Sequence, residues 1–193
     1  MSLTLVTEPT IEPITLEQLK AQLRLDVDND DELLRDLIEV ARSWVEGQTH
    51  RALASQTYDY VIDWEWPMKY GYTRIDLPLN PISSVTSITY VDNNGASQTL
   101  AANQYIVSAR NHSSYIAPAY GVSWPDVRCI PSAITVRFVA GSDTNIPVSL
   151  KHAVKMLAAH LYENREAVAP KEMMAIPFGI EALVSPYRKA GIA

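Results

Sequence analysis

The sequence predicts an α+β protein: a small helical bundle, built from the N- and C-terminal segments, with an inserted antiparallel β subdomain. Apolar residues recur with helical spacing near both ends of the chain, whereas the residues between them alternate with a period of two. The two helical ends have to bury their apolar stripes against each other. We therefore expect residues 1–54 and 145–193 to form a helical core and residues 55–144 to form the β-rich insertion.

Two helices are expected in the N-terminal segment. In "ITLEQLKAQLRL", Thr15 and Gln18 have the spacing of a capping box, and Ile14 and Leu19 have that of a hydrophobic staple. The second helix is expected from about Asp30 to Gln48, ended by Gly47 and the polar residues that follow it. Its wide apolar stripe consists of Leu33, Leu34, Leu37, Ile38, Ala41, Trp44 and Val45.

The acidic run before this second helix resembles a calcium loop only at first sight. Asp26, Asp28 and Asp30 alternate as EF-hand ligands do, but Asp31 stands where the loop needs Gly and Leu37 where it needs a bidentate Glu. A helix start fits better. Asn29 has capping-box spacing to Glu32, and the acids of the first turn are favoured by the helix dipole. No metal site is expected here.

The middle segment has the pattern of short strands. "TYDYVIDW" alternates as a half-buried strand does, and "AITVRFVAG" (133–141) predicts another. "SSVTSITYVDNNGASQTL" predicts a hairpin with Asn94 and Gly95 in a type I′ turn. "QYIVSARNHSSYIAP" predicts a second hairpin. The strands are short, so we expect a small antiparallel sheet rather than a barrel.

Helical spacing returns at Pro147, which suits a first helical position. The stripe that follows consists of Leu150, Ala153, Val154, Leu157, Ala158, Leu161 and Tyr162. A short final stripe consists of Ile180, Leu183, Val184 and Tyr187. The second long helix ends in "LYENREA" (161–167), whose charges are typical of a solvated helix end.

The composition describes an ordinary folded protein. The chain has 193 residues, 47% hydrophobic and 20% charged, which is enough to bury a sizeable core. Its net charge of −6 argues against general affinity for nucleic acid, which requires clustered Lys and Arg. The N-terminus lacks a signal-peptide pattern, and no apolar run approaches the roughly 20 residues of a membrane span. We expect a soluble protein.

The sequence offers little support for an enzyme, and we expect neither catalytic residues nor a cofactor. No metalloprotease, phosphate-loop or nucleophile-elbow motif occurs. His152 and His160 are about 12 Å apart along one helix, too far to share a metal. Asp59 and Asp63 are expected on the solvent face of a strand. Cys129 is expected to be a small packed residue.

A cluster of aromatic residues in the β segment has two interpretations. Its members are Tyr58, Tyr60, Trp64, Trp66, Tyr70 and Tyr72. They resemble a stacking platform for sugars or bases. They equally suit core and subunit-interface packing, in which Tyr and Trp are enriched. Because basic residues are not interleaved with them, we favour the interface.

The two ends of the chain resemble the head–tail connector (adaptor) proteins of tailed phages, prophages and gene transfer agents. The matching pieces occur in the same order: the leucine-led first helix, the acidic cap with "DELL", "WVE" followed by "THRAL", the "LYENRE" helix end and the terminal "LVSPYR". Each piece is weak alone, but together they are fairly specific. The insertion, residues 55–144, carries no motif that matches.

The resemblance implies a structural role. Such proteins form rings of about a dozen copies in the virion neck, beneath the portal protein, after assembly in the host cytoplasm. The ring extends the DNA channel, without sequence-specific binding, and meets a head-completion (stopper) or tail protein. By analogy, the candidate partner or ring contacts are Tyr162, Glu163, Arg165, Tyr187 and Arg188. The candidate channel-facing acids are Asp26, Asp28, Asp30, Asp31 and Glu32.

Two alternatives stay open at this point. One is another neck or tail-completion protein of the virion with a similar helical frame. The other is a ligand-binding module that uses the aromatic β segment. Binding to a purified portal would separate the connector from the first, and saturable binding of a glycan or small molecule at residues 58–72 would favour the second.

Overall fold

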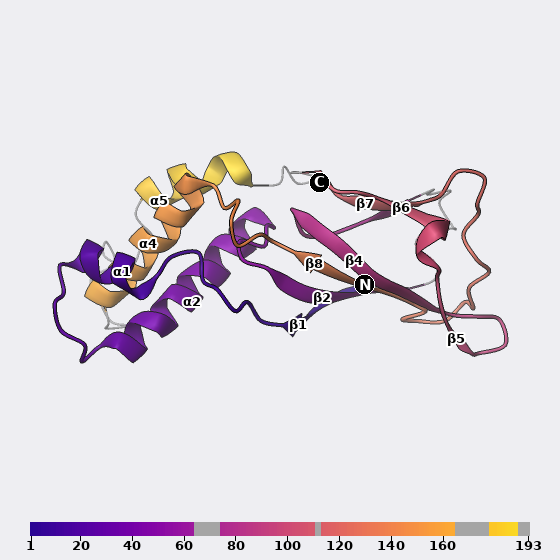
Figure 1. Ribbon diagram of the computed structural model, residues 1–193, viewed down its shortest axis with the longest axis horizontal. Helices are drawn as coiled ribbons and strands as arrows, with labels where there is room; N and C mark the ends of the chain where they lie inside the picture. Colours follow the sequence, from indigo (N-terminus) through magenta and orange to yellow (C-terminus); the bar gives the residue numbers. More distant parts are fainter. Residues whose placement is uncertain (64–73, 111–112, 165–177, 189–193) are drawn as a thin grey trace. The chain divides into compact units, whose positions relative to one another are not determined.

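A computed structural model describes residues 1–63, 74–110, 113–164 and 178–188 of the chain (Figure 1). The chain divides into two compact units. One comprises Met1–Pro9 and Ser55–Ser142, and the other Thr10–Ala54 and Asp143–Ala193. The first unit is built of antiparallel strands and the second of helices. The predicted α+β fold class is confirmed.

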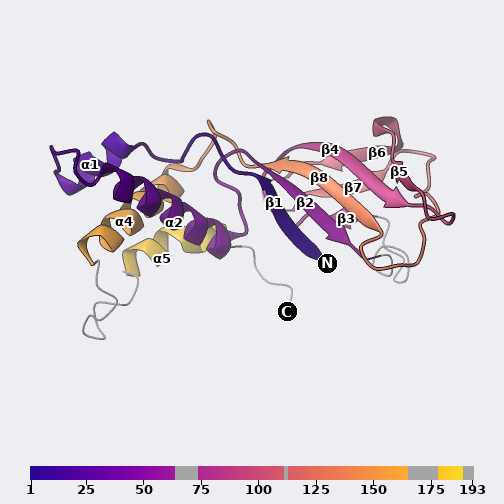
Figure 2. The same cartoon turned by 90° about the horizontal axis from the view of Figure 1, so that it is seen from below.

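The helical unit is held together by one apolar core. Its elements are α1 (Leu16–Leu23), α2 (Asp31–Thr49), α4 (Val148–Glu163), α5 (Phe178–Val184) and the 3-10 turn η2 (Ser185–Tyr187). Leu34, Ile38 and Val45 of α2 are buried with Leu150 and Val154 of α4, as their helical spacing predicts. α1 and α5 each contact both of these long helices (Figure 2). No helix in the described ranges is long and apolar enough to cross a bilayer.

The helix ends agree with the predictions in one place and differ in three. The capping box is confirmed: the Gln18 amide donates to Thr15 Oγ1 at 3.3 Å and the Thr15 amide to Gln18 Oε1 at 3.1 Å. Asn29 is not the cap of α2, which begins after Asp30. Gly47 lies inside α2, which ends where His50 turns left-handed (φ 51°). Pro147 is the residue before α4 rather than its first residue.

The β unit contains two antiparallel sheets. The five-stranded sheet has the order β1 (Ser2–Thr7), β2 (Gln56–Ile62), β8 (Ile134–Ala140), β4 (Ile82–Val91) and β5 (Ser97–Thr99). The three-stranded sheet has the order β3 (Ile75–Asp76), β7 (Tyr115–Pro118) and β6 (Tyr105–Ser108), with the 3-10 turn η1 (Ala102–Gln104) before β6. Ile116 of the smaller sheet and Phe138 of the larger are fully buried. The predicted strand 133–141 and the hairpin of β6 and β7 are confirmed.

Strand β1 was not predicted, and it changes the boundary of the β unit. Ser2 pairs with Val61 and Leu5 with Tyr58, so residues 1–9 join the β unit and not the helical core to which residues 1–54 were assigned. All six residues of β1 are exposed. A strand with neither face well covered needs no clear alternation of apolar and polar residues, and the sequence signal is correspondingly weak.

The hairpin between β4 and β5 exists, but its turn differs from the predicted type I′ turn. The Gly95 amide donates to the Asp92 carbonyl at 2.9 Å, and the Asp92 amide donates to the Ala96 carbonyl at 2.9 Å. Gly95 has φ 85°, whereas Asn94 is not left-handed. This is a three-residue loop with glycine in the left-handed position. The Asp92 carboxylate selects it by accepting the amides of Asn94 and Ala96.

Candidate functional site

The start of α2 and the end of α4 are joined by a side-chain hydrogen bond. The Tyr162 hydroxyl donates to the Asp30 carboxylate. The carboxylate of Asp30 makes no capping bond to the α2 backbone. Two residues from the predicted acid and contact sets are thus brought together inside the helical unit, where they hold two helices to one another.

The other acids of the run differ in their surroundings. Lys20 Nζ lies 2.6 Å from Asp28 Oδ1 and 2.7 Å from Asp31 Oδ1. Hydrogen bonding to Lys20 lowers the pKa of Asp28, and the same bonds raise the pKa of Lys20. Asp26 and Glu32 are exposed and form no ion pair with another described residue. Among the described residues, no three His, Cys, Asp or Glu side chains lie close enough to hold a metal ion.

The C-terminal contact candidates lie on two different parts of the helical unit. The Ser149 hydroxyl donates to the Tyr187 hydroxyl at 3.0 Å, and the Arg51 guanidinium lies 5.9 Å from the centre of the Tyr187 ring. Burial lowers the pKa of Arg51. Arg188 Nη2 donates to Gln48 Oε1 at 2.9 Å and is exposed.

Glu163 is exposed at the last residue of α4. Arg165, the remaining candidate, lies outside the described residues. Among the described residues of the "LYENRE" helix end, Glu163 is the one that is exposed and therefore open to a partner.

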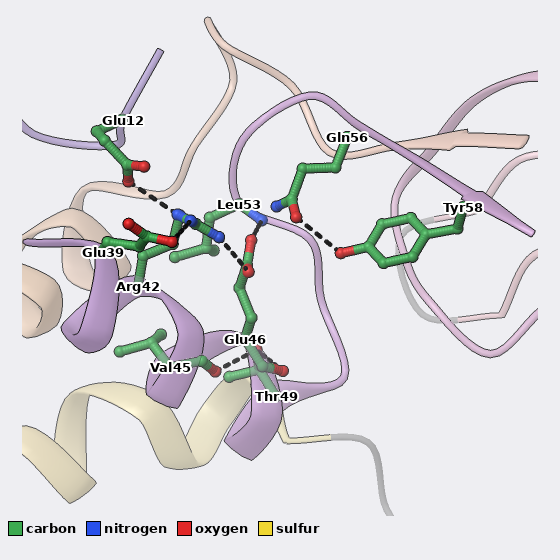
Figure 3. A network of polar contacts seen from close by, with 9 residues as sticks. All are labelled: Glu12, Glu39, Arg42, Val45, Glu46, Thr49, Leu53, Gln56 and Tyr58. Atoms are coloured by element: carbon green, nitrogen blue, oxygen red, sulfur yellow. Dashed lines mark hydrogen bonds and ion pairs between the residues drawn. The ribbon is translucent and has the colours of Figure 1, made fainter. Parts of the chain in front are cut away.

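A charged network around Arg42 was not predicted (Figure 3). Arg42 is only 5% exposed; its Nε lies 2.8 Å from Glu12 Oε2 and its Nη1 3.1 Å from Glu46 Oε2. Glu39 adds a weaker contact at 3.8 Å, and the second oxygen of Glu46 accepts the Leu53 amide at 2.7 Å. Burial lowers the pKa of Arg42, but the bonds to Glu12 and Glu46 outweigh it and the pKa is raised. The i,i+3 and i,i+4 spacing of Glu39, Arg42 and Glu46 is a signal that could have revealed the cluster.

The remaining candidates are structural. In the β unit, Arg137 binds Asp59 through two hydrogen bonds of 2.7 Å each, which agrees with a strand face open to solvent. Tyr58 stacks on Phe138 with ring centres 5.9 Å apart, and Tyr60 is buried. The other four aromatics of the cluster lie outside the described residues. Cys129 is exposed, so the prediction of a packed cysteine is wrong.

Comparison with known proteins decides the family. The sequence profile described as "Phage gp6-like head-tail connector protein" matches residues 13–99 and 101–188. The chain belongs to this family. The connector is thus a structural component of a phage-like particle, as the sequence resemblance implied. No curated protein sequence matches the connector significantly.

Three solved structures from gene transfer agent (GTA) particles are similar over the whole connector. They cover 100% of this chain and 98% of each matched chain. The neck of an empty GTA particle, computed with C6 symmetry, matches at a TM-score of 0.81 and 27% identity. The virion of a native GTA particle matches at 0.80 and 27%, and the neck of a native GTA particle, computed with C12 symmetry, at 0.74 and 28%.

Proposed function

We propose that the connector is the subunit of a ring in the neck of a tailed-phage-like particle. The ring docks beneath the portal protein, extends the DNA channel and offers its other side to a head-completion or tail protein. The observation that carries this proposal is the similarity, over the entire chain, to a protein of a GTA neck with C12 symmetry. By that analogy the ring has about a dozen copies.

Within this proposal, the helical unit builds the ring and the C-terminal segment contacts the portal. The hydroxyls of Tyr162 and Tyr187 are already bonded within the unit. Glu163, which is exposed, is therefore the contact candidate to test first, and Arg165 and Arg188 remain candidates by analogy with the family. The proposed ring would assemble in the host cytoplasm and remain in the virion neck.

The proposed channel is lined partly by acids of the run before α2. Lys20 pairs with Asp28 and Asp31, and Tyr162 donates a hydrogen bond to Asp30. Asp26 and Glu32 are therefore the acids of the run whose side chains are not engaged by another described residue. A negative lining would let DNA pass without gripping it, because like charges repel the phosphate backbone.

The test is the mass of the protein by light scattering, with negative-stain images, alone and mixed with its portal. We expect rings of about a dozen copies or co-migration with the portal. A strict monomer that ignores the portal would contradict the proposal. Saturable binding of a small ligand to residues 58–72 would then favour a ligand-binding module instead.

A further inference from the structure

We propose that neighbouring copies in the ring dock the outer side of α2 of one copy on the outer side of the first turns of α4 of the next. The acidic face consists of Asp36, Glu39, Val40 and Gly47 on α2. The basic face consists of Val148, Lys151, His152 and Lys155 on α4. This inference rests on the proposed ring and names the surfaces that close it.

The acidic face lies opposite the side of α2 that is buried in the core. Asp36, Glu39, Val40 and Gly47 are all exposed, and 54% of the Val40 surface is accessible. Asp36 has no ion-pair partner among the described residues, and Glu39 has only the 3.8 Å contact with Arg42. The face therefore presents an apolar centre flanked by two carboxylates.

Gly47 gives the acidic face a second distinguishing feature. A glycine inside a helix costs about 1 kcal/mol relative to alanine. A Cβ added at Gly47 would meet nothing within 4 Å, and its φ is not positive, so neither packing nor backbone conformation within the chain accounts for the glycine. Close approach of another copy would account for it, because a residue without a side chain lets a second helix come near.

The basic face is complementary in charge and also has an apolar centre. Val148 is 82% exposed and His152 is exposed, while Lys151 and Lys155 are half-buried. Neither lysine forms an ion pair with the part of the chain that is described. Two ammonium groups beside an exposed valine thus match two carboxylates beside an exposed valine.

The position of the two faces suits a ring. α2 and α4 contact each other through their buried sides, so the outer faces point away from one another. A closed ring of identical subunits uses two different surfaces of each subunit, one meeting the other on the next copy. Two complementary faces on opposite sides of one unit fulfil this requirement, whereas a single self-complementary patch would give a dimer.

The test changes the charge of each face separately and then of both faces together. Asp36→Lys with Glu39→Gln changes the acidic face; glutamine is chosen at 39 because a lysine would repel Arg42. Lys151→Glu with Lys155→Glu changes the basic face. We expect each pair to weaken self-association, measured by sedimentation velocity at several protein concentrations, by on the order of a hundredfold, because like charges then meet at the contact.

A chain carrying all four substitutions should regain self-association, since the two faces are again opposite in charge. Glu8→Lys with Asp126→Asn is the matched control, because it changes the net charge by the same amount as the acidic-face pair, on exposed residues of the β unit, and should leave association unchanged. Gly47→Gln distinguishes a loss of association from a loss of folding. It should raise the thermal stability of the subunit while weakening the ring.

The outcomes separate this inference from the proposed function. Rings that persist in both single-face variants would overturn the inference and leave the ring-forming role intact. Failure of the four-substitution chain to regain association, although it is folded, would also overturn the inference. A wild-type chain that stays monomeric at millimolar concentration would overturn the inference, and one that also ignores the portal would contradict the ring itself.

Discussion

The Tyr162 hydroxyl donates a hydrogen bond to the Asp30 carboxylate across a sequence separation of 132 residues. The bond joins the last turn of α4 to the residue that precedes α2. It joins the two chain segments of the helical unit, which are separated in the sequence by Ser55–Ser142 of the β unit. Both residues had been singled out from the sequence for external roles, and the structure gives them an internal one as well.

Tyr162→Phe removes this hydroxyl and keeps the aromatic side chain. We expect the free energy of unfolding of the helical unit to fall by about 1.5 to 3 kcal/mol, the usual contribution of a hydrogen bond to a charged group. Urea denaturation followed by circular dichroism measures the change.

Tyr105→Phe is the matched control, because Tyr105 is also half-buried and its hydroxyl has no bond to another described residue. It should change stability little. Asp30→Ala should be destabilising too, and the double variant should cost less than the sum of the two single variants. Additive losses would show that the two side chains act independently.

Local signals in the sequence were sufficient for most of the helices and strands, and failed where a residue distant in the sequence determines the structure. The capping box of Thr15 and Gln18 lies within four residues and was predicted correctly. The cap of α2 was placed on Asn29 because Asp30 and Tyr162 meet only in the fold. Strand β1 was missed since its partner, β2, begins about fifty residues later and neither face of β1 is well buried.

Arg42 is a buried charge that neutralises two carboxylates of the helical unit. Arg42→Met would leave Glu12 and Glu46 facing each other without a cation. We expect the free energy of unfolding to fall by about 3 kcal/mol. This is at the lower end for a broken buried ion pair because Glu12 is partly exposed. Thermal unfolding by calorimetry measures it.

Arg35→Met is the control for that substitution. Arg35 is exposed on the same helix and forms no ion pair with a described residue, so its loss should cost less than about 0.5 kcal/mol. The stability loss of Arg42→Lys should lie between those of Arg35→Met and Arg42→Met, since lysine keeps the charge but not the paired geometry. Equal effects of the Met substitutions at 35 and 42 would mean that the network contributes little.

The ion pair of Asp59 and Arg137 gives a prediction for acid pH. Hydrogen bonds from Arg137 lower the pKa of Asp59 below the ordinary value of an aspartate. A lowered pKa in the folded state contributes stability that is present above the unfolded value and is lost as the pH falls through the folded value. The stability advantage of the wild type over Asp59→Asn should therefore be constant near neutral pH and shrink below about pH 4.

Arg137→Gln tests the same pair from the other side. It should remove the same advantage and make stability less sensitive to acid over the same range. Denaturant titrations at a series of pH values measure both variants. An advantage that grows as the pH falls would contradict the assigned sign.

The sequence also showed only part of the candidate site. It located the acidic run, but five acids that look equivalent in the sequence differ in the structure, because Lys20 and Tyr162 engage three of them. The spacing of Glu39, Arg42 and Glu46 was an available signal for the Arg42 cluster, but Glu12 joins the cluster from 30 residues away and could not be found from the sequence. Charge spacing along one helix is visible in a sequence, whereas the partner from another segment is not.

The proposed channel lining gives the last prediction, on Asp26 and Glu32. Particles assembled with Asp26→Lys and Glu32→Lys should package or release DNA more slowly, because the new lysines would attract the phosphate backbone that the acids repel. The effect should weaken at higher salt, since added ions screen exposed charges. DNA release measured by a nuclease-protection or dye-access time course checks it. Glu8→Lys with Asp126→Lys is the control of equal net charge, since both residues are exposed and belong to the β unit. Normal packaging and release by the Asp26 and Glu32 variant would show that these acids do not line the channel, whereas a defect shared with the control would trace the effect to net charge alone.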